Sequence, residues 1–235
     1  MNQAARWDPA ALGAPESPFR VMDRRNVDYM KPILFDDNGR LKVLPAEVYK
    51  QFPHEDIVQF SHDHGIYGYP TTELVEFIAE ELGASRRNTI EIGAGNGVLS
   101  DALAITGTDS MMQSEPGVAA YYNLFGQPQV TYGPNVKRYD GNTAVDLYKP
   151  SAVVAQWVTH LYNPLEHWRE GNMYGVDEAK ILKKVRKYIF IGNDAPHSRK
   201  PILSLPHREI RADWIVSRAF DPALNVIWIW EKSRD

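Results

Sequence analysis

The sequence predicts an α/β fold built on a doubly wound, mostly parallel sheet. From residue 88 onward, short apolar runs alternate with segments whose apolar residues recur at helical spacing. That alternation is typical of parallel sheets covered by helices on both faces. Two apolar runs near the C-terminal end, separated by Asp221-Pro222 and Asn225, predict a closing antiparallel hairpin.

The expected elements follow one another with short connections. Strands are expected at residues 89–92, 105–109, 136–139, 151–158, 188–191, 214–216 and 226–230, and helices at residues 71–82, 98–105, 117–124 and 176–187. Thr71 provides a hydroxyl cap for the first helix and Gly83 a stop. Trp228 and Trp230 alternate onto one face of the last strand, which predicts a place in the core or at a dimer surface.

The chain divides by character into an N-terminal extension, residues 1–83, and a sheet domain, residues 84–235. The extension begins with an irregular arm rich in turn formers. A short hairpin is expected over residues 33–44, because the dipeptide Asn38-Gly39 tolerates the positive φ of a tight turn. We expect the extension to provide a lid or to determine substrate specificity.

Composition excludes several classes of protein. The chain has 235 residues, 43% of them hydrophobic, which is enough for a sizeable core. It contains no cysteine, so a disulfide scaffold, a cysteine nucleophile and a thiolate metal site are excluded. The net charge of −4 argues against duplex binding by phosphate neutralisation. No targeting segment and no apolar run of membrane-spanning length is visible, so a cytoplasmic protein without membrane association is expected.

The most informative segment is the run Glu-Ile-Gly-Ala-Gly-Asn-Gly from Glu91 to Gly97. It follows an expected strand and precedes an expected helix. Glycine lets the backbone turn sharply and approach a ligand closely, and a helix N-terminus offers free N–H donors. The dinucleotide pattern Gly-x-Gly-x-x-Gly fits poorly, because Val98 takes the position of the third glycine. The pattern is instead acidic-x-Gly-x-Gly-x-Gly.

This segment resembles motif I of the class I S-adenosylmethionine-dependent methyltransferases. The resemblance implies a Rossmann-like sheet of seven strands whose last strand is antiparallel, and S-adenosyl-L-methionine as the cofactor. It also implies that Glu91 bonds the loop or the cofactor's amino group. The loop residues that would hold the methionine part of the cofactor are Gly93, Ala94, Gly95, Asn96 and Gly97.

The resemblance implies cofactor contacts at two further positions, each matched to the family individually. An acidic residue that ends the second strand bonds the ribose hydroxyls in the family, and Asp109 takes that place here. Asp109 lies closer to Gly97 than is usual, so the first helix or its exit loop should be short, and Glu115 is the alternative acid. An acidic residue after the third strand receives the adenine amino group, and Asp140 fits. A helix cap or turn role is the alternative for each aspartate.

Candidate reacting groups follow the fourth and fifth expected strands, because ligands of doubly wound sheets lie beyond the carboxyl ends of the strands. His160 is the candidate general base, since an imidazole pKa of about 6.5 suits proton transfer near neutrality. A hydrogen-bonded loop residue is the alternative for His160. Asn193 and His197 are candidates for substrate contact, with loop capping as the alternative. Direct methyl transfer depends mainly on alignment, so it does not require a base.

The extension contributes a third group of candidates. Tyr67 is expected to contact substrate as part of a lid, with a packed aromatic loop as the alternative. His62 and His64 flank Asp63 in a pattern that can bind a metal, but no third ligand has diagnostic spacing, so no metal site is assigned.

The expected activity is direct methyl transfer from S-adenosylmethionine to an unidentified acceptor. A small molecule ranks before a protein. Nucleic acid is disfavoured, because Asn163-Pro164-Leu165 lacks the second proline and the aromatic residue of the family's base-methylating box. The alternatives are an NAD(P)-dependent oxidoreductase on a related fold and a non-catalytic adenosine-ligand-binding module. A homodimer is an alternative to a monomer.

Overall fold

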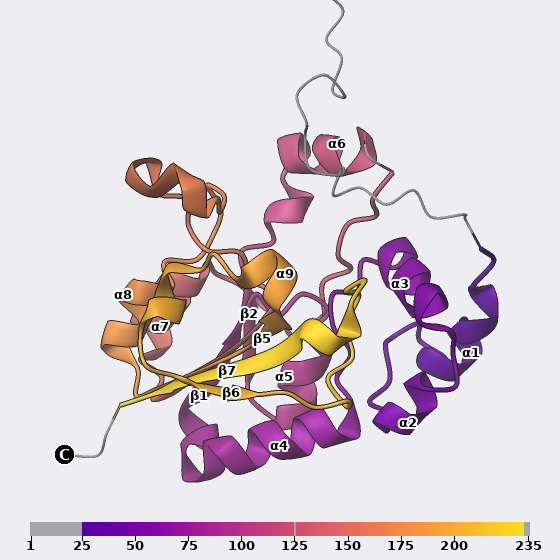
Figure 1. The fold of residues 1–235 in the computed structure, drawn as a ribbon, viewed down its shortest axis with the longest axis horizontal. Helices are drawn as coiled ribbons and strands as arrows, with labels where there is room; N and C mark the ends of the chain where they lie inside the picture. The colour runs from indigo at the N-terminus through magenta and orange to yellow at the C-terminus, as the bar shows by residue number, and fades with distance from the viewer. Residues whose placement is uncertain (1–24, 125, 233–235) are drawn as a thin grey trace, which may run out of the picture.

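A computed structural model describes residues 25–124 and 126–232, with a twisted seven-stranded sheet of order β3-β2-β1-β4-β5-β7-β6 at its centre (Figure 1). The strands are β1 (Thr89–Ile92), β2 (Thr106–Asp109), β3 (Lys137–Arg138), β4 (Ala152–Gln156), β5 (Lys187–Asn193), β6 (Arg208–Ile210) and β7 (Asn225–Glu231). Strands β1 to β5 pair in parallel, whereas β7 runs antiparallel to both β5 and β6. The predicted Rossmann-like sheet with its closing antiparallel hairpin is confirmed.

Helices cover both faces of this sheet. The α-helices are α1 (Lys31–Leu34), α2 (Ala46–Tyr49), α3 (His54–Asp63), α4 (Thr72–Leu82), α5 (Val98–Leu103), α6 (Pro116–Leu124), α7 (Gly141–Tyr148), α8 (Glu178–Lys184) and α9 (Asp194–His197). Side chains of α4 and α5 pack into the core on one face, and those of α7 and α8 on the other. Helix α6 instead stands away from the sheet and buries none of its residues (Figure 1).

The α4 prediction is confirmed in detail. The Leu74 backbone N–H donates to Thr71 Oγ1 at 3.1 Å, and Gly83 follows the helix with φ +49°. The apolar residues Leu74, Ile78 and Leu82 are buried against the sheet. Helix α4 therefore belongs to the layer that covers the sheet.

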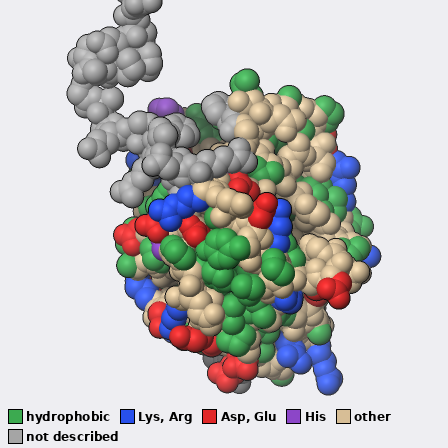
Figure 2. Space-filling model, turned by 90° about the vertical axis from the view of Figure 1, so that its right-hand side faces the viewer, with side chains coloured by type: hydrophobic (Ala, Val, Ile, Leu, Met, Phe, Trp, Pro, Cys, Tyr) green, Lys and Arg blue, Asp and Glu red, His purple; other side chains and the backbone are tan. Residues whose placement is uncertain are grey.

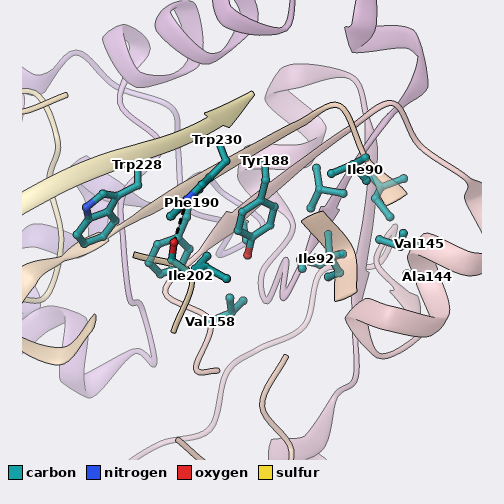
Figure 3. Close-up of a cluster of buried hydrophobic side chains, with 14 of the residues drawn as sticks. Ile90, Ile92, Ala144, Val145, Val158, Tyr188, Phe190, Ile202, Trp228 and Trp230 are labelled. Carbon is teal, nitrogen blue, oxygen red and sulfur yellow. Dashed lines mark hydrogen bonds between the residues drawn. The ribbon is translucent and has the colours of Figure 1, made fainter. Parts of the chain in front are cut away.

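The last strand places both tryptophans in the core. Trp228 stacks on Phe190 with ring centroids 5.6 Å apart, and the Trp230 indole N–H donates to the Ile202 carbonyl at 3.1 Å (Figure 3). These side chains share one face with Tyr188, as strand alternation requires. Of the two predicted places for the tryptophans, the core is therefore confirmed.

Two sequence expectations were wrong. Around Asn38-Gly39 the turn forms, but only an isolated bridge joins Phe35 to Leu41, because the chain before the turn is helix α1. Strand β7 pairs with β5 and β6, and not with residues 214–216. Strand β6 is short and carries charged residues, so its sequence has no apolar signal. Residues 214–216 pack beside Tyr69 instead, whose N–H donates to the Val216 carbonyl at 3.0 Å.

The described part of the extension forms a small cluster of its own beside the sheet. Met30, Leu34, Tyr49 and Phe60 are buried there, and Val98 of α5 joins them. Figure 2 shows hydrophobic side chains gathered at the centre of the face over α1, α2 and α3, bordered by charged ones. Among residues 25–124 and 126–232, none of the helices has the length and apolar character needed to cross a bilayer.

Candidate active site

A cleft of about 220 Å³ opens beyond the carboxyl ends of β1, β2 and β4. Segments distant in sequence line it: residues 65–68 before α4, 93–96 after β1, 109–113 after β2, 140–142 at the start of α7, 156–159 after β4 and 172–176 before α8, together with Tyr122, Val130 and Tyr132. Carboxyl ends of adjacent parallel strands meet at one edge, so loops far apart in sequence converge there.

The glycine loop between β1 and α5 has a backbone that glycine alone adopts readily. Gly93, Gly95 and Gly97 have φ values of +63°, +52° and +72°. A Cβ atom at Gly93 would lie 2.4 Å from Val158 Cγ1, and one at Gly97 would lie 2.7 Å from Val136 Cγ2. The close packing of the neighbouring valines therefore adds to the φ requirement. Gly93, Ala94, Gly95 and Asn96 line the cleft, whereas Gly97 begins α5 behind it.

Asp109 ends β2 at the cleft and holds the glycine loop. Its Oδ2 accepts from the Gly95 N–H at 3.0 Å, and its Oδ1 accepts from the Met111 N–H at 2.7 Å. Burial raises the pKa of Asp109, and these two hydrogen bonds oppose that rise. Glu115, the alternative acid, instead forms an ion pair with Arg138 and does not line the cleft.

Asp140 lines the cleft from the start of α7. Its Oδ1 accepts from the backbone N–H groups of Asn142 and Thr143 at 3.1 and 3.0 Å, so Asp140 is the N-cap of that helix. Burial works against ionisation, but the hydrogen bonds from Thr143 and Asn142 outweigh it and lower the pKa of Asp140. An ionised carboxylate is therefore held at the cleft wall.

Glu91 is buried beneath the loop and does not itself line the cleft. Its Oε2 has no hydrogen-bond partner among the described residues. Burial raises the pKa of Glu91 to about 8, the nearby Asp109 and Asp101 carboxylates add to the rise, and hydrogen bonds to Ser100 oppose it. At neutral pH the side chain is mainly a neutral acid.

Tyr67 lines the cleft from the segment before α4. The Arg218 guanidinium lies 4.5 Å from the centroid of the Tyr67 ring. The backbone N–H of Arg218 donates to the backbone carbonyl of Tyr67 at 3.1 Å. The Tyr67 hydroxyl lies 3.5 Å from the Tyr122 hydroxyl and accepts from Gln113 Nε2 at 3.4 Å. Sequence reasoning missed Tyr122 and Gln113, because no motif marks either residue and both lie beyond the residue that ends β2.

Trp157 lines the cleft directly after β4. Its φ of +56° is unusual for a bulky residue, and its N–H donates to the Ile191 carbonyl at 2.9 Å, which holds the backbone to β5. Among the described residues, neither Trp157 Nε1 nor Gln156 Nε2 has a hydrogen-bond partner. The sequence pattern placed Trp157 inside a strand, and the left-handed backbone that turns it toward the cleft could not be foreseen.

His160, Asn193 and His197 do not line the cleft. The side chain of Asn193 caps α9 and donates to the Asp221 carbonyl at 2.9 Å. His197 Nδ1 lies 2.9 Å from the Asn193 carbonyl oxygen. Burial, helped by the Lys200 charge, lowers the pKa of His197 to about 3, and the same two causes lower the pKa of His160.

The histidine pair of the extension lies elsewhere. His62 belongs to the last turn of α3, and the His64 ring packs on Phe60 with centroids 4.4 Å apart. No group of three His, Cys, Asp or Glu side chains suited to a metal ion occurs in residues 25–124 and 126–232.

Comparisons with known proteins find similarity to solved structures alone. No protein-family model matches the chain, and no curated protein matches it. It is similar to an rRNA methylase from Streptococcus thermophilus (14% identity, 68% of this chain and 94% of that one, TM-score 0.39). It is also similar to an S-adenosylmethionine-dependent O-methyltransferase from Thermotoga maritima, with 12% identity and a TM-score of 0.40 over 76% of this chain and 72% of that one. A third similar structure is a precorrin-6y C5,15-methyltransferase from Geobacter metallireducens, with 12% identity and a TM-score of 0.36 over 69% of this chain and 89% of that one.

Proposed function

We propose that the chain is an S-adenosylmethionine-dependent methyltransferase that transfers the methyl group directly to an acceptor. A small molecule is favoured over a protein as that acceptor. The observation that carries the proposal is one cleft. There the glycine loop, Asp109 and Asp140 meet at the carboxyl edge of a sheet of order β3-β2-β1-β4-β5-β7-β6. These are the three places at which the family resemblance puts cofactor contacts: motif I gives the loop, and the two aspartates carry over individually.

The residues of the cleft fit this cofactor. The loop at Gly93 and Gly95 has no side chain between its backbone and the cleft, so a ligand can approach the peptide groups closely. The Asp109 carboxylate fixes the loop through the Gly95 N–H, and Asp140 adds a carboxylate that stays ionised. When bound, S-adenosylmethionine supplies a methyl group on a positively charged sulfur. The chain's contribution is to align the acceptor with that methyl carbon and to exclude water.

Calorimetry tests the proposal. We expect S-adenosylmethionine and S-adenosylhomocysteine to bind with one site per chain, and NADH not to bind. Binding of NADH alone would refute the proposal and favour the oxidoreductase. A non-catalytic module is expected to bind S-adenosylmethionine without ever converting it to S-adenosylhomocysteine in the presence of acceptor candidates.

Gly93→Ala is expected to weaken S-adenosylhomocysteine binding at least tenfold, which corresponds to about 1.4 kcal/mol. The new methyl group would meet Val158 Cγ1 at 2.4 Å, so the loop must move away from its place in the cleft. Calorimetry measures the change in affinity.

Gly39→Ala is the matched control. Gly39 has φ +73°, but a Cβ added there would have no other atom within 4 Å. The residue does not line the cleft. The substitution should cost about 1–2 kcal/mol of stability from backbone strain and leave the affinity unchanged. Equal losses of affinity in both variants would contradict a role for the loop in binding.

A further inference from the structure

The part of the cleft left over after the cofactor contacts is aromatic and uncharged. Asp109 and Asp140, both assigned to the cofactor, are the charged side chains among the described residues that line the cleft. The rest of the wall carries Tyr67, Trp157 and further tyrosines, with carboxamides between them. A phosphate or carboxylate entering there would lose its hydration without meeting a cationic side chain among the residues that line the cleft, which is costly.

Two aromatic residues of this wall are held in place by contacts with neighbouring residues. Trp157 keeps a left-handed conformation, φ +56°, fixed by its hydrogen bond to the Ile191 carbonyl. The Tyr67 ring lies 6.2 Å from the Trp157 ring, centroid to centroid, and is backed by the Arg218 guanidinium. Because a strained conformation persists only where the surroundings enforce it, its position in a cleft indicates a functional use of the indole.

Exposed apolar side chains continue from the cleft outward. Tyr174 lines the cleft and is itself 49% exposed, and Met173 beside it in sequence is 76% exposed. Tyr122 also lines the cleft, from helix α6, which buries none of its residues. The mouth of the cleft therefore offers apolar and aromatic surface to an entering molecule, as at ligand sites lined by hydrophobic residues with few polar groups.

From the uncharged wall, the fixed indole and the apolar mouth, we infer that the acceptor is a planar aromatic molecule without net charge, methylated on a hydroxyl or amino group. Planar rings stack favourably on tryptophan and tyrosine. The inference rests on the proposed function and specifies its substrate. The acceptor's oxygen or nitrogen attacks the methyl carbon, the carbon–sulfur bond breaks with its electron pair remaining on sulfur, and the acceptor's proton passes to water.

The test uses three matched probes with the full chain: 2-naphthol, the anion 2-naphthoate, and saturated, non-planar decahydro-2-naphthol. Each is titrated by calorimetry with and without saturating S-adenosylhomocysteine. We expect 2-naphthol to bind at least tenfold more tightly than the other two when S-adenosylhomocysteine is present. Equal or tighter binding of 2-naphthoate or of the saturated alcohol would overturn the inference.

Variants locate the binding. Trp157→Leu should weaken 2-naphthol at least tenfold and change S-adenosylhomocysteine affinity less than twofold. Trp214→Leu is the matched control, because Trp214 packs on Phe77 away from the cleft, and it should change neither affinity. If Trp157→Leu fails to fold, Tyr174→Leu at the exposed mouth replaces it, with a loss of at least threefold expected. Unchanged 2-naphthol affinity in the folded variant would overturn the inference.

The two proposals fail in different ways. Absence of S-adenosylhomocysteine binding refutes the proposed function whatever the probes do. Binding of S-adenosylhomocysteine without preference for 2-naphthol leaves the methyltransferase assignment standing and refutes the aromatic acceptor.

Discussion

Lys200→Met is expected to lower the free energy of unfolding by about 3–5 kcal/mol. Lys200 Nζ lies 2.8 Å from Glu178 Oε2, and both side chains are fully buried. Glu178 Oε1 also accepts from the Tyr188 hydroxyl at 2.8 Å, and the Lys200 ammonium lies 4.2 Å from the centroid of the Phe190 ring. Removing the ammonium leaves a buried carboxylate beside an apolar sheet face, without the cation that compensates its charge.

Urea unfolding measures the loss, and two variants separate its causes. The double variant Glu178→Gln with Lys200→Met should recover most of it, because the uncompensated charge is gone and the amide can still accept from Tyr188. Lys50→Met is the matched control. Its ammonium also lies 2.8 Å from a carboxylate, that of Asp213, but both side chains are exposed, so less than about 1 kcal/mol is expected. Similar losses for Lys50 and Lys200 would show that burial is not the cause.

The sheet could be predicted because its information is local. Strands β4 and β5 are short, mostly apolar and buried runs, and parallel strands of this kind need no partner-specific signal. Strand β6 fails this condition: it is three residues long and begins Arg208-Glu209, so nothing in its composition marks it. Its pairing is decided by β7, which offers an open edge.

The site was predictable where the backbone chemistry is local and not where it depends on tertiary contacts. Gly93 and Gly95 have positive φ values, which glycine adopts readily, so the run of glycines after a strand predicts the turn directly. Both residues line the cleft. The place of Trp157 depends on a hydrogen bond to β5, 34 residues later at Ile191, which no local pattern encodes. His197 follows a strand as expected, but its ring turns inward among Trp157, Phe190 and Trp228.

Glu91→Gln is expected to remove a pH dependence of stability that the native chain carries. Glu91 has an ordinary pKa of 4.5, and burial raises the pKa to about 8 in the folded chain. Between these values the folded chain keeps a proton that the unfolded chain releases. The unfolded state then binds fewer protons, so stability falls as pH rises, by up to about 1.4 kcal/mol per pH unit. The whole loss, about 3–5 kcal/mol, is complete once pH passes about 8.

The free energy of unfolding of both proteins, measured in urea from pH 5 to pH 9, isolates this one group, because every other titration is common to the two. Near pH 5 the side chain is neutral in both folded proteins and only a small part of the loss has occurred, so their difference there reports mainly the packing cost of the amide. As pH rises, Glu91→Gln should become more stable relative to the native chain by a few kcal/mol. The amide cannot ionise, whereas the native carboxyl would have to ionise while Oε2 is buried without a hydrogen-bond partner among the described residues. A constant difference across the range would mean that Glu91 is ionised in the fold. Its Oε2 would then need a cationic or N–H partner near the glycine loop.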